Sequence, residues 1–332
     1  MNISVVIPTY NRERYLKKCL YSLLVQKKLP YEIIVIDNAN HNLAQDVVNN
    51  LKSKFDKKGI IITYMRNFEN SGATARNLGV SIATGQLIAF LDDDVVLDDN
   101  YYQEIEKIFI KYPNALGVQG YDKKFYKSHN KIQNGFFNKA VYLFEKIFMI
   151  MFFFEKEKSR VLPSLCVTYP EPGFQSLLQS EWISTCAGVF SKSVFENYKF
   201  DSQLKKYSWN EYLDFSYSIF LENPKSLFIT SKATYIDAQT AAGRLPHKEL
   251  IYMSEVYDMY IFLKRFNVNY YNLTIYIWSK VGRIFYNIVK IIVRKPRELK
   301  LALHYLYAPL YVIRNLFKIK RGDLSFFNKT LT

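Results

Sequence analysis

Three consecutive aspartates, Asp92, Asp93 and Asp94, are the residues of this chain with the clearest capacity for chemistry. They follow five apolar residues, Leu87 to Leu91, which are typical of a buried β-strand. Three carboxylates cannot enter the same apolar core without a compensating charge. Their hard oxygens suit Mg²⁺ or Mn²⁺, ions that also take phosphate oxygens as ligands. The triplet therefore predicts a metal and diphosphate site, with a solvated acidic turn before a helix as the alternative.

The segments around this triplet alternate between strand and helix patterns. Such alternation predicts an α/β fold in which a mostly parallel sheet is flanked by helices. In a sheet of this kind, functional groups collect where the strands end. Strand patterns are expected at 3–8, 33–36, 60–65, 87–91 and 116–120, and helical patterns at 12–26, 44–55, 73–83 and 100–111.

Polar residues follow four of the expected strands at their carboxyl ends. Pro8 to Arg12 follow the first, Asp37 and Asn38 the second, Arg66 to Gly72 the third, and the aspartate triplet the fourth. Open α/β sheets bind ligands at this edge, so we predict a nucleotide site there. Neither GxGxxG nor GxxxxGK(S/T) occurs, which disfavours a hydride-transfer enzyme and excludes a phosphate-loop NTPase.

Charge and cysteine content narrow the class of partner and the compartment. The 332 residues carry a formal net charge of +15, which indicates an anionic partner such as a phosphorylated substrate, a nucleic acid or an anionic membrane. Cys19, Cys166 and Cys186 lie far apart, so we expect neither a disulfide framework nor a zinc site. The chain enters a strand pattern directly and has no apolar run of spanning length, so we expect no signal peptide and a cytoplasmic protein.

Four segments resemble the N-terminal half of glycosyltransferase family 2. They read SVVIPTYNR at 4–12, EIIVIDN at 32–38, NSGATARNLG at 70–79 and FLDDD at 90–94, in the order and spacing of that family. A weaker likeness continues to about residue 245. The resemblance implies an inverting enzyme of the GT-A fold, with a Rossmann-like nucleotide-binding half, that uses a nucleotide-diphosphate sugar.

Carried over position by position, the resemblance implies a donor site that holds Mn²⁺ or Mg²⁺. Asn38 is a departure, because many members carry a second aspartate there, although its amide can still hydrogen-bond a base edge. Asp237 stands where many relatives have a metal-ligand histidine, and we expect its carboxylate to join the same ion. By resemblance, Pro8, Thr9 and Tyr10 line the nucleotide, Asp37 contacts the base, Arg76 lies near the base and phosphates, Asp92 approaches the ribose with Asp93 beside it, and Asp94, with Asp92, holds the metal that bridges the diphosphate.

An inverting transfer needs a carboxylate that deprotonates the acceptor hydroxyl. The family usually reads Glu-Asp-x-Asp in this part of the chain, whereas here the residues are Glu211-Tyr212-Leu213-Asp214. A neutral phenol titrates near about pH 10 and is a poor base at neutral pH. We therefore assign the base to Glu211, with Asp214, one helical turn on, as the alternative. In the loop that follows Asp237, Arg244 is a candidate contact for the diphosphate, because arginine suits phosphate.

The C-terminal segment is strongly basic, with fourteen Lys and Arg against two acidic residues from Lys264 to Thr332. Within 273–293 a polar stripe crosses an otherwise apolar helical pattern, and 299–317 repeats the theme, which predicts helices lying on an anionic membrane. Core-packing helices with a solvated basic edge are the alternative. A nucleic-acid partner is not expected, because no DNA- or RNA-binding signature accompanies the charge. The stripe consists of Lys280, Arg283, Asn287, Lys290 and Arg294.

By pattern the chain divides into three parts. Residues 1–122 are expected to form the nucleotide-sugar-binding half of a catalytic domain, 123–248 its acceptor-side half, and 249–332 a basic amphipathic helical tail. In the middle part, 136–154 is apolar with interspersed charges, and we favour a packing helix over a membrane-docking or acceptor-binding segment.

These observations lead to one functional prediction and one rival. We predict an inverting, hexosyl-type glycosyltransferase, peripheral on the inner face of the cell membrane, which passes a sugar to a hydroxyl of a glycan or lipid-linked glycan. The rival is a catalytically silent nucleotide-sugar-binding or scaffolding protein of the same fold. The tyrosine at position 212 is the feature that favours the rival.

Overall fold

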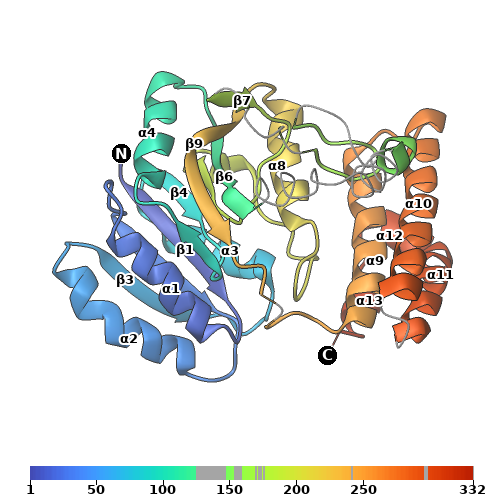
Figure 1. Cartoon of the computed structure of the whole chain (residues 1–332), viewed down its shortest axis with the longest axis horizontal. Helices are drawn as coiled ribbons and strands as arrows, with labels where there is room; N and C mark the ends of the chain where they lie inside the picture. Colours follow the sequence, from blue (N-terminus) through green and yellow to red (C-terminus); the bar gives the residue numbers. More distant parts are fainter. Residues whose placement is uncertain are drawn as a thin grey trace. The chain divides into compact units, whose positions relative to one another are not determined.

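The computed structural model describes residues 1–124, 147–152, 159–168, 170, 174, 176–240, 242–294 and 298–331. The chain divides into two compact units (Figure 1). One comprises Met1–Lys131 and Pro170–Arg244, and the other comprises Ile132–Tyr169 and Leu245–Thr332. The predicted division after residues 122 and 248 stays a prediction.

The first unit is built on one sheet, in which the described residues form nine strands. The order is β3-β2-β1-β4-β8-β6-β9-β5, and β7 pairs with β9 off this path. β1 is parallel to β2 and β4, β2 to β3, and β6 to β9, whereas β8 is antiparallel to both β4 and β6. The predicted α/β class is confirmed. The sheet is mixed rather than mostly parallel, because four pairings among the described strands are parallel and four, including β5 with β9 and β7 with β9, are antiparallel. The strands are β1 (Ile3–Thr9), β2 (Glu32–Asp37), β3 (Ile61–Arg66), β4 (Leu87–Phe90), β5 (Val95–Leu97), β6 (Gly117–Asp122), β7 (Leu177–Gln179), β8 (Gly188–Ser191) and β9 (Leu227–Asp237).

Helices cover both faces of this sheet. One apolar core is shared by α1 (Glu13–Leu24), α2 (Leu43–Asp56) and α4 (Tyr101–Lys111). The other is shared by α3 (Gly72–Ile82) and α8 (Glu211–Glu222), with the short α7 (Val194–Asn197) beside it. The predicted helices of the first half are therefore present, with ends that differ from the predicted ones by no more than two residues.

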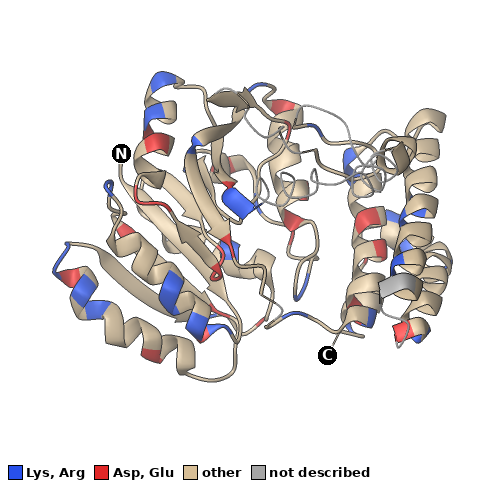
Figure 2. Cartoon of the chain, in the orientation of Figure 1, with Lys and Arg blue, Asp and Glu red and all other residues tan. Residues whose placement is uncertain are grey.

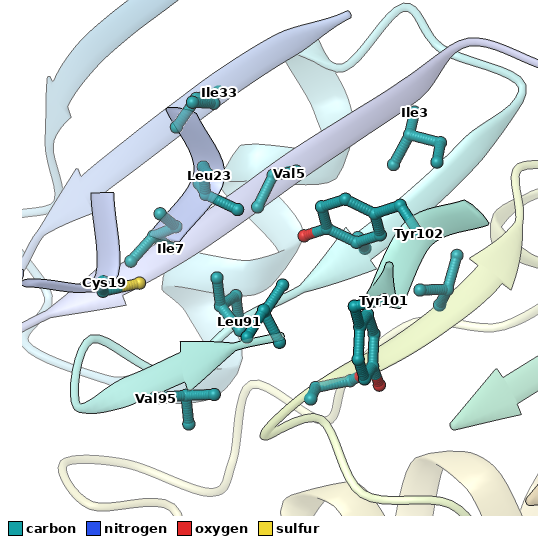
Figure 3. Packing of buried hydrophobic residues seen from close by; sticks show 14 of the residues in the cluster. Ile3, Val5, Ile7, Cys19, Leu23, Ile33, Leu91, Val95, Tyr101 and Tyr102 are labelled. Carbon is teal, nitrogen blue, oxygen red and sulfur yellow. The ribbon is translucent and has the colours of Figure 1, made fainter. Parts of the chain in front are cut away.

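Alternate residues of strand β1 belong to two different apolar cores. Ile3, Val5 and Ile7 face the α1 side, where Figure 3 shows Val5 and Ile7 near Leu23, and Val6 faces the α3 side. Alternate residues of a strand point to opposite faces, so a wholly apolar strand fills two cores at once. Burying each such side chain contributes about 1.5–3 kcal/mol. The strands that deliver the polar edge are thus held from both sides.

The second unit is helical in its described part. It contains α9 (His247–Arg265), α10 (Tyr270–Arg294), α11 (Leu299–Arg314), α12 (Leu316–Lys320) and α13 (Ser325–Asn328), and residues 147–151 are also helical. α11 packs against both α9 and α10. The predicted C-terminal helices are confirmed, while most of the predicted 136–154 helix lies outside the described residues. None of the helices in the described ranges has the length and apolar character needed to cross a bilayer.

The predicted basic stripe of α10 does not face outward along its whole length. Lys280 is buried and its Nζ donates to Asp258 Oδ2 at 2.8 Å, with Glu255 Oε2 at 3.0 Å. Arg283 Nη1 donates to the same Asp258 oxygen at 2.6 Å. Lys280 and Arg283 therefore neutralise carboxylates of α9 inside the unit, and the prediction that they face an anionic surface is wrong. Helical spacing groups residues on one face, but it does not tell which neighbour covers that face.

Helix α3 packs on β1 through Gly79. A Cβ at this position would lie 2.3 Å from Val6 Cγ1. Gly79→Ala should therefore lower the free energy of unfolding by about 1–3 kcal/mol, because overpacking forces the helix off the strand. Urea denaturation followed by circular dichroism measures this change.

The matched control is Ser81→Ala on the exposed side of the same helix, which should change stability by no more than about 0.5 kcal/mol. Adding Val6→Ala to Gly79→Ala should recover part of the loss by making room for the new methyl group. A Gly79→Ala protein as stable as the parent would contradict the packing described above.

The charge cluster of the second unit gives another test. Asp258→Ala leaves Arg283 and Lys280 in a buried position without their shared carboxylate, so we expect a loss of about 3–5 kcal/mol in the free energy of unfolding. Lys248→Ala, at an exposed position of α9, is the control and should be nearly neutral. Equal stabilities of the two variants in urea denaturation would show that water already screens the cluster.

Candidate active site

The predicted site centres on Arg76, which projects from α3 between two carboxylates. Its Nη2 donates to Asp92 Oδ1 at 2.9 Å, and its Nη1 contacts Glu211 Oε1. Arg76 and Glu211 are both buried, and Glu211 follows Arg76 by 135 residues. The ion pairs thus join the end of β4, the start of α3 and the start of α8. Sequence analysis named all three residues but gave no contact between them.

The start of α3 explains how Arg76 is positioned. Ser71 is the N-cap, and its Oγ accepts a hydrogen bond from the Thr74 amide. The Gly72 amide donates to the carbonyl of Lys206, which precedes α8 by a few residues. A Cβ on Gly72 would lie 3.0 Å from Arg76 Nη1 and 3.2 Å from Glu211 Oε1. A larger residue at position 72 would therefore crowd the ion pair.

Glu211 is the first residue of α8, and its carboxyl group has a raised pKa. Burial raises the pKa of Glu211 to about 7, with Arg76 lowering it and Asp92 raising it. Its Oε2 is buried and has no hydrogen-bond partner in the described part of the chain. One carboxylate oxygen is thus fixed by the guanidinium, and the other remains able to accept a proton.

Tyr212 and Asp214, which lie near Glu211 in the sequence, have different surroundings. The ring of Tyr212 packs with that of Trp182, at 5.8 Å between centroids. Asp214 is buried one turn further into α8. Glu211, by contrast, contacts Arg76, which also contacts Asp92.

The aspartate triplet is not a solvated turn, because each member has its own partner. Asp92 accepts from Arg76, as described above. Asp93 is buried, accepts from Thr9 Oγ1 at 2.7 Å and from Arg12 Nη1 at 3.0 Å, and has its pKa raised by burial to about 7. Asp94 Oδ2 accepts from the Thr240 amide at 3.0 Å. The alternative of an acidic turn in water is therefore wrong.

Arg12 and the residues after β9 enclose the triplet from the side of β1. Arg12 Nη1 lies 3.6 Å from Asp94 Oδ2, and its Nε donates to the Ala242 carbonyl at 2.6 Å. Gly243 has a φ of +68°, and a Cβ there would lie 2.4 Å from the Tyr10 carbonyl oxygen. Sequence reasoning placed Arg12 in a motif but missed this role. The signal was available, since three adjacent carboxylates at the end of a buried strand need a nearby cation.

Tyr207 is a second residue that sequence reasoning missed. Burial raises the pKa of its phenol, Arg244 lowers it, and Asp92 raises it. Tyr207 is thus within electrostatic reach of Arg244 and of Asp92. Nothing in the pattern around Tyr207 distinguishes it from an ordinary loop residue, so only the folded chain could identify it.

The predicted base-binding residues lie at the next strand end. β1 and β2 pair with Thr9 beside Asp37. Asp37 is fully buried; its Oδ1 accepts from the Ala39 amide and its Oδ2 from Tyr64 Oη, both at 2.9 Å. Asn38 Oδ1 accepts from Asn67 Nδ2 at 2.7 Å. Each Asp37 oxygen keeps a second lone pair, so contact with a base stays a prediction. Pro8 and Tyr10 are both half-buried at the end of β1.

The carboxylate oxygens at this edge of the sheet suit a divalent ion that is held by one or two carboxylates. Asp237 is paired in register with Val95, next to Asp94, and its pKa is raised to about 6 by burial, with Asp94, Asp92 and Asp122 adding to the shift. Among the described residues, no three His, Cys, Asp or Glu side chains are already gathered as a metal cage. Mg²⁺ does not need such a cage, because it keeps waters and takes substrate phosphates as ligands. Asp94 makes both of its described contacts through Oδ2.

Comparison with known proteins agrees with this geometry. The sequence model of glycosyl transferase family 2 matches residues 4–171. Glycosyltransferase GlyA of Streptococcus pneumoniae is 30% identical over 120 residues, which are 36% of this chain and 16% of that protein. The poly(ribitol-phosphate) β-glucosyltransferase of Bacillus spizizenii is 37% identical over 97 residues, 28% of this chain and 15% of that protein. The chain thus spans only a small part of the length of these relatives.

The fold has solved counterparts. The crystal structure of S. aureus TarS 1-349 in complex with UDP-GlcNAc superimposes with a TM-score of 0.54 at 13% identity, covering 99% of this chain and 90% of that chain. This likeness confirms the predicted GT-A architecture. Since the family model covers half of the sequence and the motifs that carry it converge on one edge of the sheet, the chain belongs to glycosyl transferase family 2.

Proposed function

We propose that this chain is an inverting, hexosyl-type glycosyltransferase that moves a sugar from a nucleotide-diphosphate sugar to a hydroxyl of a glycan or lipid-linked glycan. The observation that carries the proposal is the buried carboxylate of Glu211, which Arg76 joins to Asp92 at the end of β4. A proton acceptor is thereby fixed next to the predicted donor site, as a single displacement requires.

The donor is proposed to lie along the ends of β1, β2 and β4. S. aureus TarS has been crystallised with UDP-GlcNAc, and a donor of the same chemical class is proposed for this chain. The base and ribose would be bound at the strand ends, and Arg76 and Arg244 would face the diphosphate as charge-assisted donors. The proposed donor contacts are Pro8, Thr9, Tyr10, Asp37, Asn38, Arg76, Asp92 and Asp93.

In the proposed transfer, the acceptor hydroxyl attacks the anomeric carbon as Glu211 takes its proton on Oε2. The new bond joins the acceptor oxygen to the anomeric carbon, and the bond from that carbon to the diphosphate oxygen breaks, so the nucleotide diphosphate leaves with the bonding electrons. Arg76 holds Glu211 through Oε1 and favours its charged form, while burial keeps the pKa high enough for the carboxylate to act as a base.

Asp94, with Asp92 and Asp237, would hold Mn²⁺ or Mg²⁺. When bound, such an ion neutralises the charge that develops on a departing diphosphate. The protein's own contribution at this point is positional, because the Thr240 amide and Arg12 fix the Asp94 carboxylate from one side. Its second oxygen is thereby left to face a ligand.

The rival proposal is a silent nucleotide-sugar-binding protein, which Tyr212 favours because that position usually carries the family's base. Glu211 supports the enzyme instead, because its buried carboxylate supplies a base one residue earlier. A cytoplasmic location, peripheral on the inner face of the cell membrane, also stays a proposal.

Substitution of the base separates the candidates. Glu211→Gln keeps the shape and should lower kcat for transfer or for donor hydrolysis by about 10²–10⁴-fold, with little change in donor KM. Tyr212→Phe should retain activity, and Asp214→Asn should lose less than Glu211→Gln. Release of nucleotide diphosphate from labelled donors measures all three. A larger loss of kcat in Asp214→Asn than in Glu211→Gln would assign the role of base to Asp214. Binding of the sugar nucleotide by the parent without release of nucleotide diphosphate would favour the silent protein.

The raised pKa of Glu211 predicts a pH profile. A general base acts in its ionised form, so activity should be low where Glu211 is protonated and rise as pH passes through about 7. Measuring kcat/KM between about pH 5.5 and 8.5 follows this limb. In Glu211→Gln the residual activity should lose the limb. A parent profile already flat down to about pH 5.5 would contradict the assignment.

The metal proposal can be tested without turnover. Sugar nucleotides of UDP, GDP, dTDP and CDP should include one that raises the melting temperature in the presence of Mn²⁺ and less so without it, because a ligand stabilises the state that binds it. Asp94→Asn should remove the Mn²⁺-dependent part of that shift. Asp46→Asn, at an exposed position of α2, should leave it intact. An unchanged Mn²⁺-dependent shift in the melting temperature of Asp94→Asn would show that the ion binds elsewhere.

A further inference from the structure

Helix α10 exposes apolar side chains along one face. Ile277, Val281, Phe285, Val289 and Ile292 follow one another at intervals of four, four, four and three residues, so they share a face of the helix. Each of these side chains is between 41 and 55% exposed. On a helix of a water-soluble unit this face would normally be charged or polar.

Helix α11 also exposes apolar side chains along one face, and this pattern continues into α12. Its exposed apolar residues, with Phe317 of α12, are 49 to 65% exposed. α10 and α11 pack against each other, and Figure 2 draws them mostly tan, with few charged residues. We call the two stripes together the outer apolar face. Its α11 and α12 members are Leu299, Leu303, Leu306, Leu310, Ile313 and Phe317, and its α10 members are the five residues named above.

Some charged side chains of this unit lie inside instead. Asp258 is fully buried and pairs with Lys280 and Arg283, as described for the fold. The unit therefore buries charged side chains and exposes large apolar ones. Single exposed apolar residues are common, but eleven of them lie on α10 and on α11 with α12, and α10 packs against α11. Exposed apolar residues in such number mark an interaction site.

Charge complementarity identifies what covers this face. Between Lys264 and Thr332 there are fourteen basic residues and two acidic ones, and the ion pairs described for the fold join Lys280 and Arg283 to acids of α9. Exposed basic residues lie next to the stripes in the same helices, namely Lys290, Lys300, Arg314 and Lys318. A second copy of the chain would bring like charges together at such an interface, whereas an anionic lipid leaflet supplies the opposite charge.

Aromatic residues agree with a lipid partner. Tyr270 and Tyr271 at the start of α10 and Tyr307 on α11 are all exposed. Tyrosine is favoured where a protein meets lipid headgroups, because its ring is apolar and its hydroxyl is polar. Apolar stripes, exposed tyrosines and a basic rim are the composition of a helix pair that lies in a membrane interface.

We propose that the outer apolar face docks onto the surface of an anionic lipid bilayer, with α10 and α11 lying in the interface plane. The apolar stripes enter the headgroup region and the basic residues beside them contact anionic headgroups. The contact surface thus differs from the predicted basic stripe, two members of which are buried against α9. The proposal goes beyond the catalytic one and does not depend on it, since it concerns residues that take no part in donor binding.

Sedimentation of the full chain with vesicles tests the proposal. Vesicles of phosphatidylcholine with phosphatidylglycerol should carry the protein down, and vesicles of phosphatidylcholine alone should do so less. The double variant Phe285→Ser/Leu306→Ser should weaken partitioning by about tenfold or more, because two anchoring side chains are lost. The matched control is Val25→Ser/Ile110→Ser, which replaces two exposed apolar residues of the first unit and should partition like the parent.

Two results would overturn the proposal. One is partitioning of Phe285→Ser/Leu306→Ser equal to that of the parent. The other is absence of vesicle binding together with a concentration-dependent dimer, seen by light scattering, that the same variant abolishes, since the face would then cover a second copy. Donor hydrolysis, measured in parallel, should be alike in parent, variant and control, so a failure of vesicle binding is distinguishable from a failure of the catalytic proposal.

Discussion

A buried guanidinium between two carboxylates is the interaction on which the first unit depends. Arg76 brings a positive charge into a region from which water is excluded, and such a charge is tolerated only where opposite charges and hydrogen bonds compensate it. Asp92 and Glu211 supply them from opposite halves of the chain. The start of α8 is therefore tied to the end of β4 by electrostatics as well as by packing.

Burial also gives the carboxylates of this edge unequal chemistry. Asp93 faces Thr9 and Arg12, Asp94 faces a backbone amide, and Glu211 has one oxygen without a partner in the described chain. Carboxyl groups that lie close together thus have different partners, because the charges and hydrogen-bond donors around each of them differ. The roles proposed for these carboxylates rest on this division: Asp93 holds structure, Asp94 faces a ligand and Glu211 accepts a proton.

The second unit follows the opposite arrangement. Its ion pairs between α9 and α10 are enclosed, and its exposed helices carry leucine, isoleucine and phenylalanine. Enclosed ion pairs contribute specificity by fixing which helix faces meet, since a misaligned pair would leave a charge unpaired. The same pairs turn Lys280 and Arg283 of α10 toward α9, while the apolar side chains of the outer apolar face stay exposed.

The sequence by itself determined the elements and the edge of the sheet at which the functional residues gather. Alternating and helical periods are local, so β1, β2, β4 and α3 could be located from residue order. The resemblance to glycosyltransferase family 2 led to the prediction that Asp92, Asp94 and Glu211 serve one site. Only the tertiary structure decided the partners. Arg12 reaching Asp93, Tyr207 approaching the triplet, Tyr212 packing on Trp182 and Lys280 facing Asp258 all depend on contacts between distant segments. A period tells which residues share a face, but the neighbour that covers the face is set by how the whole chain packs.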